Sequence, residues 1–209
     1  QDILCTKILF KLHIYLINFH NKGEMNMKTI IKKMLFAIWL LTVICICYYF
    51  YIVEIYKFDI VSANKKLPKY AQTAIAEWSI ESGSEDVMNS LYAASDQLNG
   101  NIVLGLTVPS DHKIYLSKKG YYAQIAYIHE IGHVVDFNNN YPSSSEEFKR
   151  IYLKEKDNYI SSNFCVSKEY ITSNEAEFFA EIFKNICEND DKSLKSVPES
   201  VRFVRKYCK

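Results

Sequence analysis

The segment at residues 121–137, YYAQIAYIHEIGHVVDF, sets two histidines and a glutamate into an otherwise mostly apolar run. Isoleucine and valine surround these polar residues, which favours one buried helix. Residues four apart lie on the same face of a helix, so His129 and His133 point the same way, about one turn apart. A buried polar group without a partner is costly. The polar residues of this helix therefore need a common explanation.

A divalent metal ion supplies that explanation. Two imidazoles one turn apart suit a single zinc ion, and Glu130, beside His129, is placed to hold a metal-bound water. Two alternatives compete: the H-E-x-x-H spacing also arises by chance, and a buried histidine is usually a core residue whose hydrogen bonds are satisfied. Neither explains why two histidines and a glutamate share one apolar helix, so Zn²⁺ is the predicted cofactor.

Two histidines leave a catalytic zinc one ligand short, because such sites usually have three protein ligands and a water. A third histidine six residues after His133 is excluded, since Asn139 occupies that position. The other source is a glutamate from a later helix. The segment NEAEFFAE offers three of them, Glu175, Glu177 and Glu181.

Helix capping separates these glutamates. Thr172-x-x-Glu175 matches the capping-box pattern, which assigns Glu175 to the start of a helix predicted at residues 173–188. Glu177 and Glu181 lie four apart on one face, among phenylalanines that supply core contacts. We therefore expect Glu177 to be the third ligand, and Glu181 to accept a hydrogen bond from a ligand histidine. The alternative, a solvated acidic helix face, suits Glu175 best.

An uncharged apolar run at residues 34–53 predicts a helix long enough to cross a bilayer. Lysines precede the run, so the positive-inside bias places the N-terminus in the cytoplasm and the rest of the chain outside. Val61-Ser62-Ala63 resembles a signal-peptidase site. However, charged residues separate it from the run, and the run exceeds the usual apolar core of a signal peptide. Cleavage stays open, with a retained anchor slightly favoured.

The apolar run divides the chain into three predicted parts. Residues 1–26 are expected to be non-native upstream sequence or a disordered segment, because Met27 begins a stretch typical of exported proteins. Residues 27–63 form the signal sequence or membrane anchor, and residues 64–209 form one globular domain. The formal net charge is only +1, so the chain does not suggest nucleic-acid binding.

The globular part is expected to be α+β, mostly helical with a small sheet. Its only strand-like stretches are residues 102–108 and 113–117. The first is expected either at the sheet edge, where an extended peptide adds by β-augmentation, or in the core. A disulfide between Cys187 and Cys208 is left open. Helices besides the two already named are expected from residue 67 to Gly83, at 84–98, at 146–160 and from Pro198.

Two stretches together, HEIGHVVDF and KEYITSNEAEFFAEIF, resemble the catalytic domain of the anthrax lethal factor-like metallopeptidases, which include the secreted Pro-Pro endopeptidases. The second stretch is the more specific, because H-E-x-x-H alone occurs in many families. The resemblance covers roughly residue 112 to the C-terminus and implies a zincin-like fold. It also implies these roles: zinc ligands His129, His133 and Glu177, general base Glu130, transition-state-stabilising Tyr170, and second carboxylate Glu181.

Residues and resemblance together predict a zinc-dependent endopeptidase that hydrolyses a secreted or extracellular protein with a metal-activated water. The enzyme would be secreted, or anchored to the outer face of the membrane through residues 34–53. The alternative is a membrane-tethered binding or regulatory protein on an inactive zincin fold. The matching site positions are intact, which favours the enzyme. The large receptor-binding regions of lethal factor have no counterpart here, so entry into host cells does not carry over.

Overall fold

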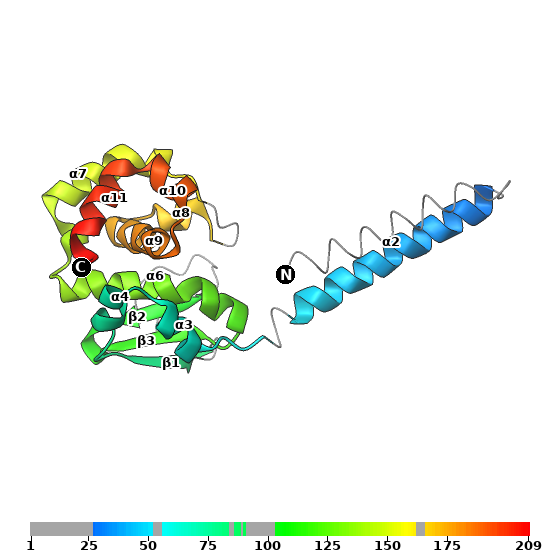
Figure 1. Cartoon of the computed structure of the whole chain (residues 1–209), viewed down its shortest axis with the longest axis horizontal. Coiled ribbons are helices and arrows are strands. Elements are labelled where there is room, and N and C mark those ends of the chain that lie inside the picture. Colours follow the sequence, from blue (N-terminus) through cyan, green and yellow to red (C-terminus); the bar gives the residue numbers. More distant parts are fainter. Residues whose placement is uncertain (1–26, 52–55, 84–85, 89, 91–102, 162–165) are drawn as a thin grey trace. The chain divides into compact units, whose positions relative to one another are not determined.

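Figure 1 shows the computed structural model of the chain. The segment 1–26 lies outside the described residues, as does most of the helix predicted at 84–98. The chain forms two compact units, Gln1–Phe50 and Tyr51–Lys209. The second unit begins before residue 64, where the sequence placed the start of the globular domain. The described residues are 27–51, 56–83, 86–88, 90, 103–161 and 166–209.

The described part of the first unit is one helix, α2 (Met27–Phe50). Its large apolar side chains are exposed, Phe36 and Trp39 among them. From Lys28 to Phe50 it is long and apolar enough to span a membrane, a test that a signal sequence near an N-terminus also passes. The apolar helix predicted from the sequence is therefore confirmed.

A three-stranded sheet in the order β1-β3-β2 lies at one side of the second unit. The central strand β3 (Lys113–Ser117) pairs in parallel with β1 (Ser79–Gly83) and antiparallel with β2 (Gly105–Val108). β2 is thus an edge strand, one of the two placements expected for residues 102–108. The expectation of only two strands is wrong, since β1 is a third.

One short helix and β1 replace the single helix predicted from residue 67 to Gly83. Leu67 and Pro68 are extended and separate α3 (Ile60–Lys66) from α4 (Lys69–Ala74). Proline disfavours a helical conformation in the residue before it, which explains this break. Four apolar residues of this stretch are nevertheless buried: Leu67, Ala71, Ile75 and Trp78.

The segment that precedes α3 is docked against the start of the central helix α6 (Gly120–Asn138). A Cβ added to Gly120 would lie 2.7 Å from the Phe58 backbone nitrogen, so only glycine allows this close approach. The Phe58 ring packs edge-on against Tyr127 of α6, with centroids 5.2 Å apart. Ile60 and Ala63 also pack against the core. Residues 58–63 therefore belong to the globular unit.

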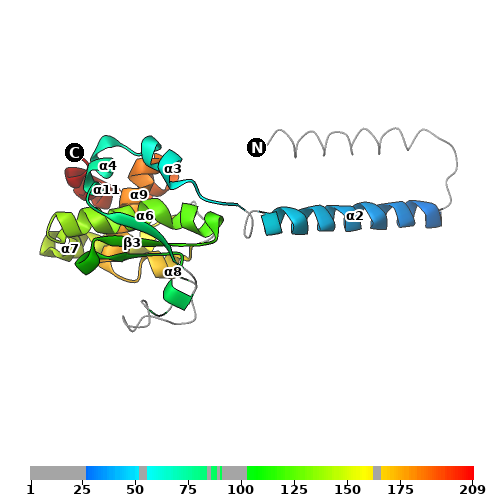
Figure 2. The same ribbon diagram turned by 90° about the horizontal axis from the view of Figure 1, so that it is seen from below.

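α6 lies between the sheet and the C-terminal helices, and Figure 2 shows it next to β3 and α9 from a second direction. It confirms the helix predicted at 121–137. The helix predicted at 146–160 ends early and continues as a 3-10 turn at Lys156–Asn158. The helices on the far side of α6 are α7 (Glu146–Glu155), α8 (Lys168–Ile171), α9 (Glu175–Glu188), α10 (Asp191–Ser196) and α11 (Pro198–Val204).

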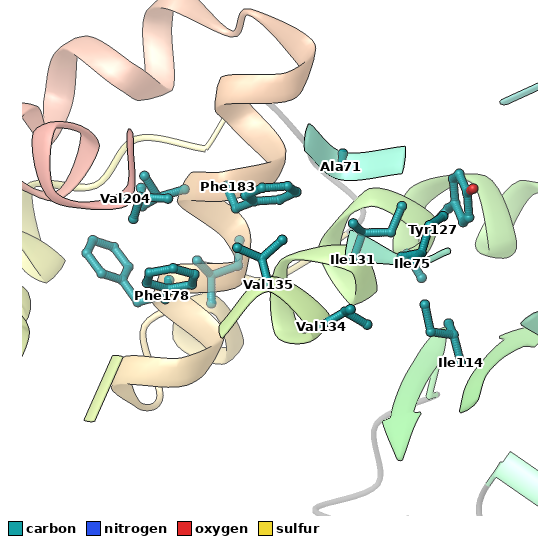
Figure 3. Close-up of a cluster of buried hydrophobic side chains, with 14 of the residues drawn as sticks. Ala71, Ile75, Ile114, Tyr127, Ile131, Val134, Val135, Phe178, Phe183 and Val204 are labelled. Carbon is teal, nitrogen blue, oxygen red and sulfur yellow. The ribbon is translucent and has the colours of Figure 1, made fainter. Parts of the chain in front are cut away.

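The hydrophobic core surrounds α6 (Figure 3). Val135 of α6 lies beside Phe178 and Phe183 of α9, and all three are buried. Ile114 reaches the core from β3, and Val204 reaches it from α11. Because apolar contacts bury α6 on the sheet side and on the α9 side, its polar residues are held in a fixed frame.

Gly132 marks the closest approach of α6 and α9. A Cβ at this position would lie 2.7 Å from the Ala180 Cα and 2.8 Å from the Ala180 carbonyl oxygen. Both atoms belong to the backbone of α9, so a side chain at position 132 would fit only if one helix moved away from the other. The two helices that carry the polar site residues are therefore in backbone contact.

We expect Gly132→Ala to destabilise the protein by about 1–3 kcal/mol through overpacking at Ala180. Helix propensity alone predicts the opposite sign, because alanine is favoured over glycine in a helix interior by roughly 1 kcal/mol. Urea unfolding of the metal-free protein measures the sign directly. A more stable Gly132→Ala variant would contradict the close approach of α6 and α9.

Candidate metal centre

His129 and His133 of α6 meet Glu177 of α9 at one point. One donor atom from each residue lies within 4.8 Å of the others. Glu177 Oε2 is 3.0 Å from His129 Nε2 and 3.6 Å from His133 Nε2. The imidazole rings are 5.0 Å apart, nearly perpendicular. The structure therefore brings together the three ligands expected from the sequence, and two imidazoles with one carboxylate form a donor set that suits zinc.

Glu181 lies one turn further along α9, behind His129. Its Oε2 is 3.1 Å from His129 Nδ1, and its Oε1 accepts hydrogen bonds from the Tyr159 hydroxyl and the Lys184 ammonium, each at 3.2 Å. Both charged side chains are almost fully buried. The carboxylate expected behind the ligands is thus in place. Tyr159 and Lys184 were not predicted as partners of Glu181. The spacing of three residues between Glu181 and Lys184 could have indicated the second of these contacts.

Glu130 points from α6 towards the edge strand β2. Its Oε2 accepts a hydrogen bond from the Thr107 hydroxyl at 2.7 Å. A Cβ on Gly105 would come within 2.7 Å of the Glu130 carboxylate, so the glycine leaves room for it. Burial raises the pKa of Glu130, and the opposing effect of His133 and His129 only offsets this in part. A raised pKa suits a group that takes up and returns a proton.

Burial and ion pairing shift the pKa values of two candidate ligands, His129 and Glu177. Burial lowers the pKa of His129, but hydrogen bonds to Glu177 and Glu181 outweigh it and raise the pKa to about 10. Burial raises the pKa of Glu177, but His133 and His129 outweigh this and hold it well below its usual range. A metal ion that binds His129 Nε2 would therefore compete with a proton for that nitrogen.

Tyr170 lies on α8 and lines the same pocket as Glu130, His133 and Glu177. Its ring centroid is 6.4 Å from that of His129. The Tyr170 N–H donates to the Ser167 hydroxyl, which caps this short helix. No helix was expected between residues 160 and 173, so α8 is a correction. The helix places the tyrosine next to the candidate ligands.

The start of α9 differs from the predicted capping box. The cap is Asn174, whose side-chain oxygen accepts a hydrogen bond from the Glu177 N–H at 2.9 Å. Thr172 instead ends α8, and its hydroxyl donates to the Lys168 carbonyl at 2.8 Å. The capping role expected for Glu175 is therefore wrong. The structure nevertheless places Glu177, the ligand preferred from the sequence, at the metal centre. The reason is not a capping role of Glu175 but the Asn174 cap, which fixes the backbone at Glu177 itself.

Cys187 and Cys208 are free thiols, so the disulfide left open by the sequence is not formed. The Cys187 sulfur lies 3.5 Å from the Tyr70 hydroxyl. Burial raises the pKa of both thiols, to about 12 for Cys187 and about 11 for Cys208. Both side chains therefore carry their protons at neutral pH.

A zincin-like metallopeptidase fold is defined by this arrangement, in which a small sheet covers one side of the H-E-x-x-H helix and a glutamate-bearing helix covers the other. The family model described as anthrax toxin lethal factor, N- and C-terminal domain, matches residues 98–206, just over half of the chain. The chain belongs to this lethal factor-like metallopeptidase family.

The comparison with solved structures gives 20% identity and a TM-score of 0.46 to the Pro-Pro endopeptidase from Paenibacillus alvei. That match covers 70% of this chain and 89% of the endopeptidase. A search of curated proteins finds no matching sequence.

Proposed function

We propose that this protein is a zinc-dependent endopeptidase. The observation that carries the proposal is the convergence of His129, His133 and Glu177 within 4.8 Å, beside a pocket that Glu130 also lines. Membership of the lethal factor-like family supports it. Glu177 from α9 completes the donor set of a catalytic zinc, which leaves the remaining position for water or substrate.

The side chains of the pocket have separate roles in this proposal. Zinc held by His129, His133 and Glu177 would lower the pKa of a water towards about 7 and would polarise the peptide carbonyl. Glu130 would accept a proton as the water attacks the peptide carbonyl carbon, and would deliver it to the nitrogen as the C–N bond breaks. The Tyr170 hydroxyl donates a hydrogen bond to the oxygen that becomes negative. Glu181 accepts from His129 Nδ1, which leaves His129 Nε2 free for the metal.

The edge strand β2 is the proposed docking site for the substrate backbone. β2 pairs with β3 along one side, and the edge of such a strand accepts an extended peptide by β-augmentation. Leu106 and Thr107 of β2 line the pocket together with Glu130. A peptide paired with β2 would therefore run past the general base.

We further propose that the catalytic unit works outside the cell, with α2 as a retained anchor. Val61-Ser62-Ala63, the sequence that resembles a cleavage site, lies within α3, where the Ser62 N–H is bonded to the Asp59 carboxylate. Cleavage after Ala63 would remove Phe58 and Ile60 from the core. The anchor is then residues 27–50, and the catalytic unit is residues 51–209.

The proposal is tested with the full chain in detergent, loaded with zinc and incubated with a randomised peptide library. We expect about one zinc per chain, together with internal peptide cleavage that a chelator stops and added zinc restores. Bound zinc without cleavage of any peptide would favour a non-catalytic binding protein. A chain that takes up no zinc would contradict the assigned ligands.

A further inference from the structure

We propose that Tyr141 binds an apolar side chain of the peptide substrate and so helps to select the cleaved sequence. This inference rests on the proposed peptidase function. Tyr141 follows α6 and lines the same pocket as Glu130, His133 and Tyr170. It is 47% exposed, so a large part of the residue is accessible to a bound peptide.

The backbone of Tyr141 is held in the left-handed region, with φ 55° and ψ 60°. A bulky side chain is disfavoured in this conformation, which glycine and asparagine adopt more easily. The preceding residue, Asn140, also has a positive φ and is of the tolerant type. Glycine or asparagine at position 141 would serve the turn at least as well, so the tyrosine ring needs another explanation.

Hydrogen bonds to α6 hold this loop in place. The Tyr141 N–H donates to the Asp136 carbonyl at 2.8 Å. The buried Asp136 carboxylate accepts the Ser143 N–H at 2.9 Å and the Ser143 hydroxyl at 2.6 Å. The Tyr141 ring also packs edge-on against Phe137, with centroids 5.7 Å apart. Because the ring is already fixed by α6, substrate binding has little side-chain freedom to remove.

The charges around the pocket favour an apolar substrate side chain. Among the residues that the structure describes, the pocket lining includes three carboxylates and neither lysine nor arginine, so away from the metal site an acidic side chain meets no cationic side chain there. Each carboxylate already has partners, which are the histidines for Glu177, Thr107 for Glu130 and Ser143 for Asp136. An aromatic surface gains most from covering apolar area. The inferred substrate is therefore a peptide with an apolar residue against Tyr141 and no acidic residue beside it.

Cleavage profiles of two glycine variants test this inference on the full zinc-loaded chain in detergent. We expect Tyr141→Gly to lower kcat/KM for the preferred peptides by roughly 10- to 100-fold and to remove the apolar preference at one substrate position. Its zinc content and melting temperature should not fall, because glycine relieves the left-handed strain. Tyr141→Phe keeps the ring and should keep the preference. Asn140→Gly is the matched control. It relieves similar backbone strain at the neighbouring position and should leave the cleavage profile unchanged.

An unchanged profile in Tyr141→Gly would overturn the inference, as would a fall in its melting temperature that accounts for the lost activity. Peptide selection by binding, carried out in a Glu130→Gln background, separates this failure from failure of the peptidase proposal. If the wild type cleaves no peptide, the peptidase proposal fails. Enrichment of apolar residues among bound peptides, lost with Tyr141→Gly, would still support the role of Tyr141. No such enrichment would overturn it.

Discussion

Replacing Glu130 with glutamine is expected to abolish detectable peptide cleavage while the zinc content stays near one ion per chain. Glutamine keeps the shape of the side chain and can still accept the hydrogen bond from Thr107, but it cannot take up a proton from water. General acid–base catalysis by one side chain typically contributes about 10²–10⁴-fold in rate. Measurement of kcat/KM together with metal analysis checks both parts of the expectation.

The matched control for this variant is Glu147→Gln. Glu147 is an exposed carboxylate on α7 that pairs with Lys206, so the same chemical change there should leave cleavage and zinc content unaltered. Full cleavage activity in Glu130→Gln would show that another group accepts the proton. Loss of zinc from that variant would instead place Glu130 among the ligands.

The second large effect is expected for Glu177→Ala, which removes the carboxylate that lies 3.0 Å from His129 Nε2. Loss of a residue that merely orients a ligand costs about 10- to 100-fold in metal affinity, and loss of the ligand itself should cost more. Chelator competition measures the zinc affinity without reference to activity. Circular dichroism checks that α9 still forms, since the cap Asn174 is untouched.

Glu175→Ala provides the matched control on the same helix. Glu175 lies in the first turn of α9, where a carboxylate contributes only about 0.3–1 kcal/mol through the helix dipole. We expect this variant to bind zinc as the wild type does and to lose a little stability. Zinc retained by Glu177→Ala and lost from Glu175→Ala would refute the proposed ligand set.

The parts of the fold that follow from local spacing were predictable from the sequence. Residues 121–137 carry a helical pattern along their whole length, so α6 was predicted to within a residue at each end. The pairing of Glu177 with Glu181 on one face is also a matter of spacing, and the structure places both against His129. Edge placement of β2 was one of two expected outcomes.

The parts that depend on contacts between distant segments were not predictable. β1 contains a single large apolar residue, Ile80, and it is a strand because its backbone pairs with β3 more than thirty positions later. Thr172 carries the capping-box pattern, yet α8 runs up to it and leaves its backbone unsuited to an N-cap. The left-handed backbone of Tyr141 is likewise fixed by Asp136 and Ser143, which no local pattern reveals.

The docking of Phe58 onto Tyr127 has a consequence for the reach of the enzyme. With Phe50 at the end of α2 and Tyr56 at the start of the segment docked on α6, only a short connection joins the proposed anchor to the catalytic unit. Five residues, 51–55, lie between them, so the six residue steps from Phe50 to Tyr56 span at most about 21 Å when fully extended. A retained anchor would then keep the proposed protease close to the membrane surface, where tethering raises its effective concentration towards neighbouring surface proteins. Lengthening the connection would widen its working radius without altering the pocket.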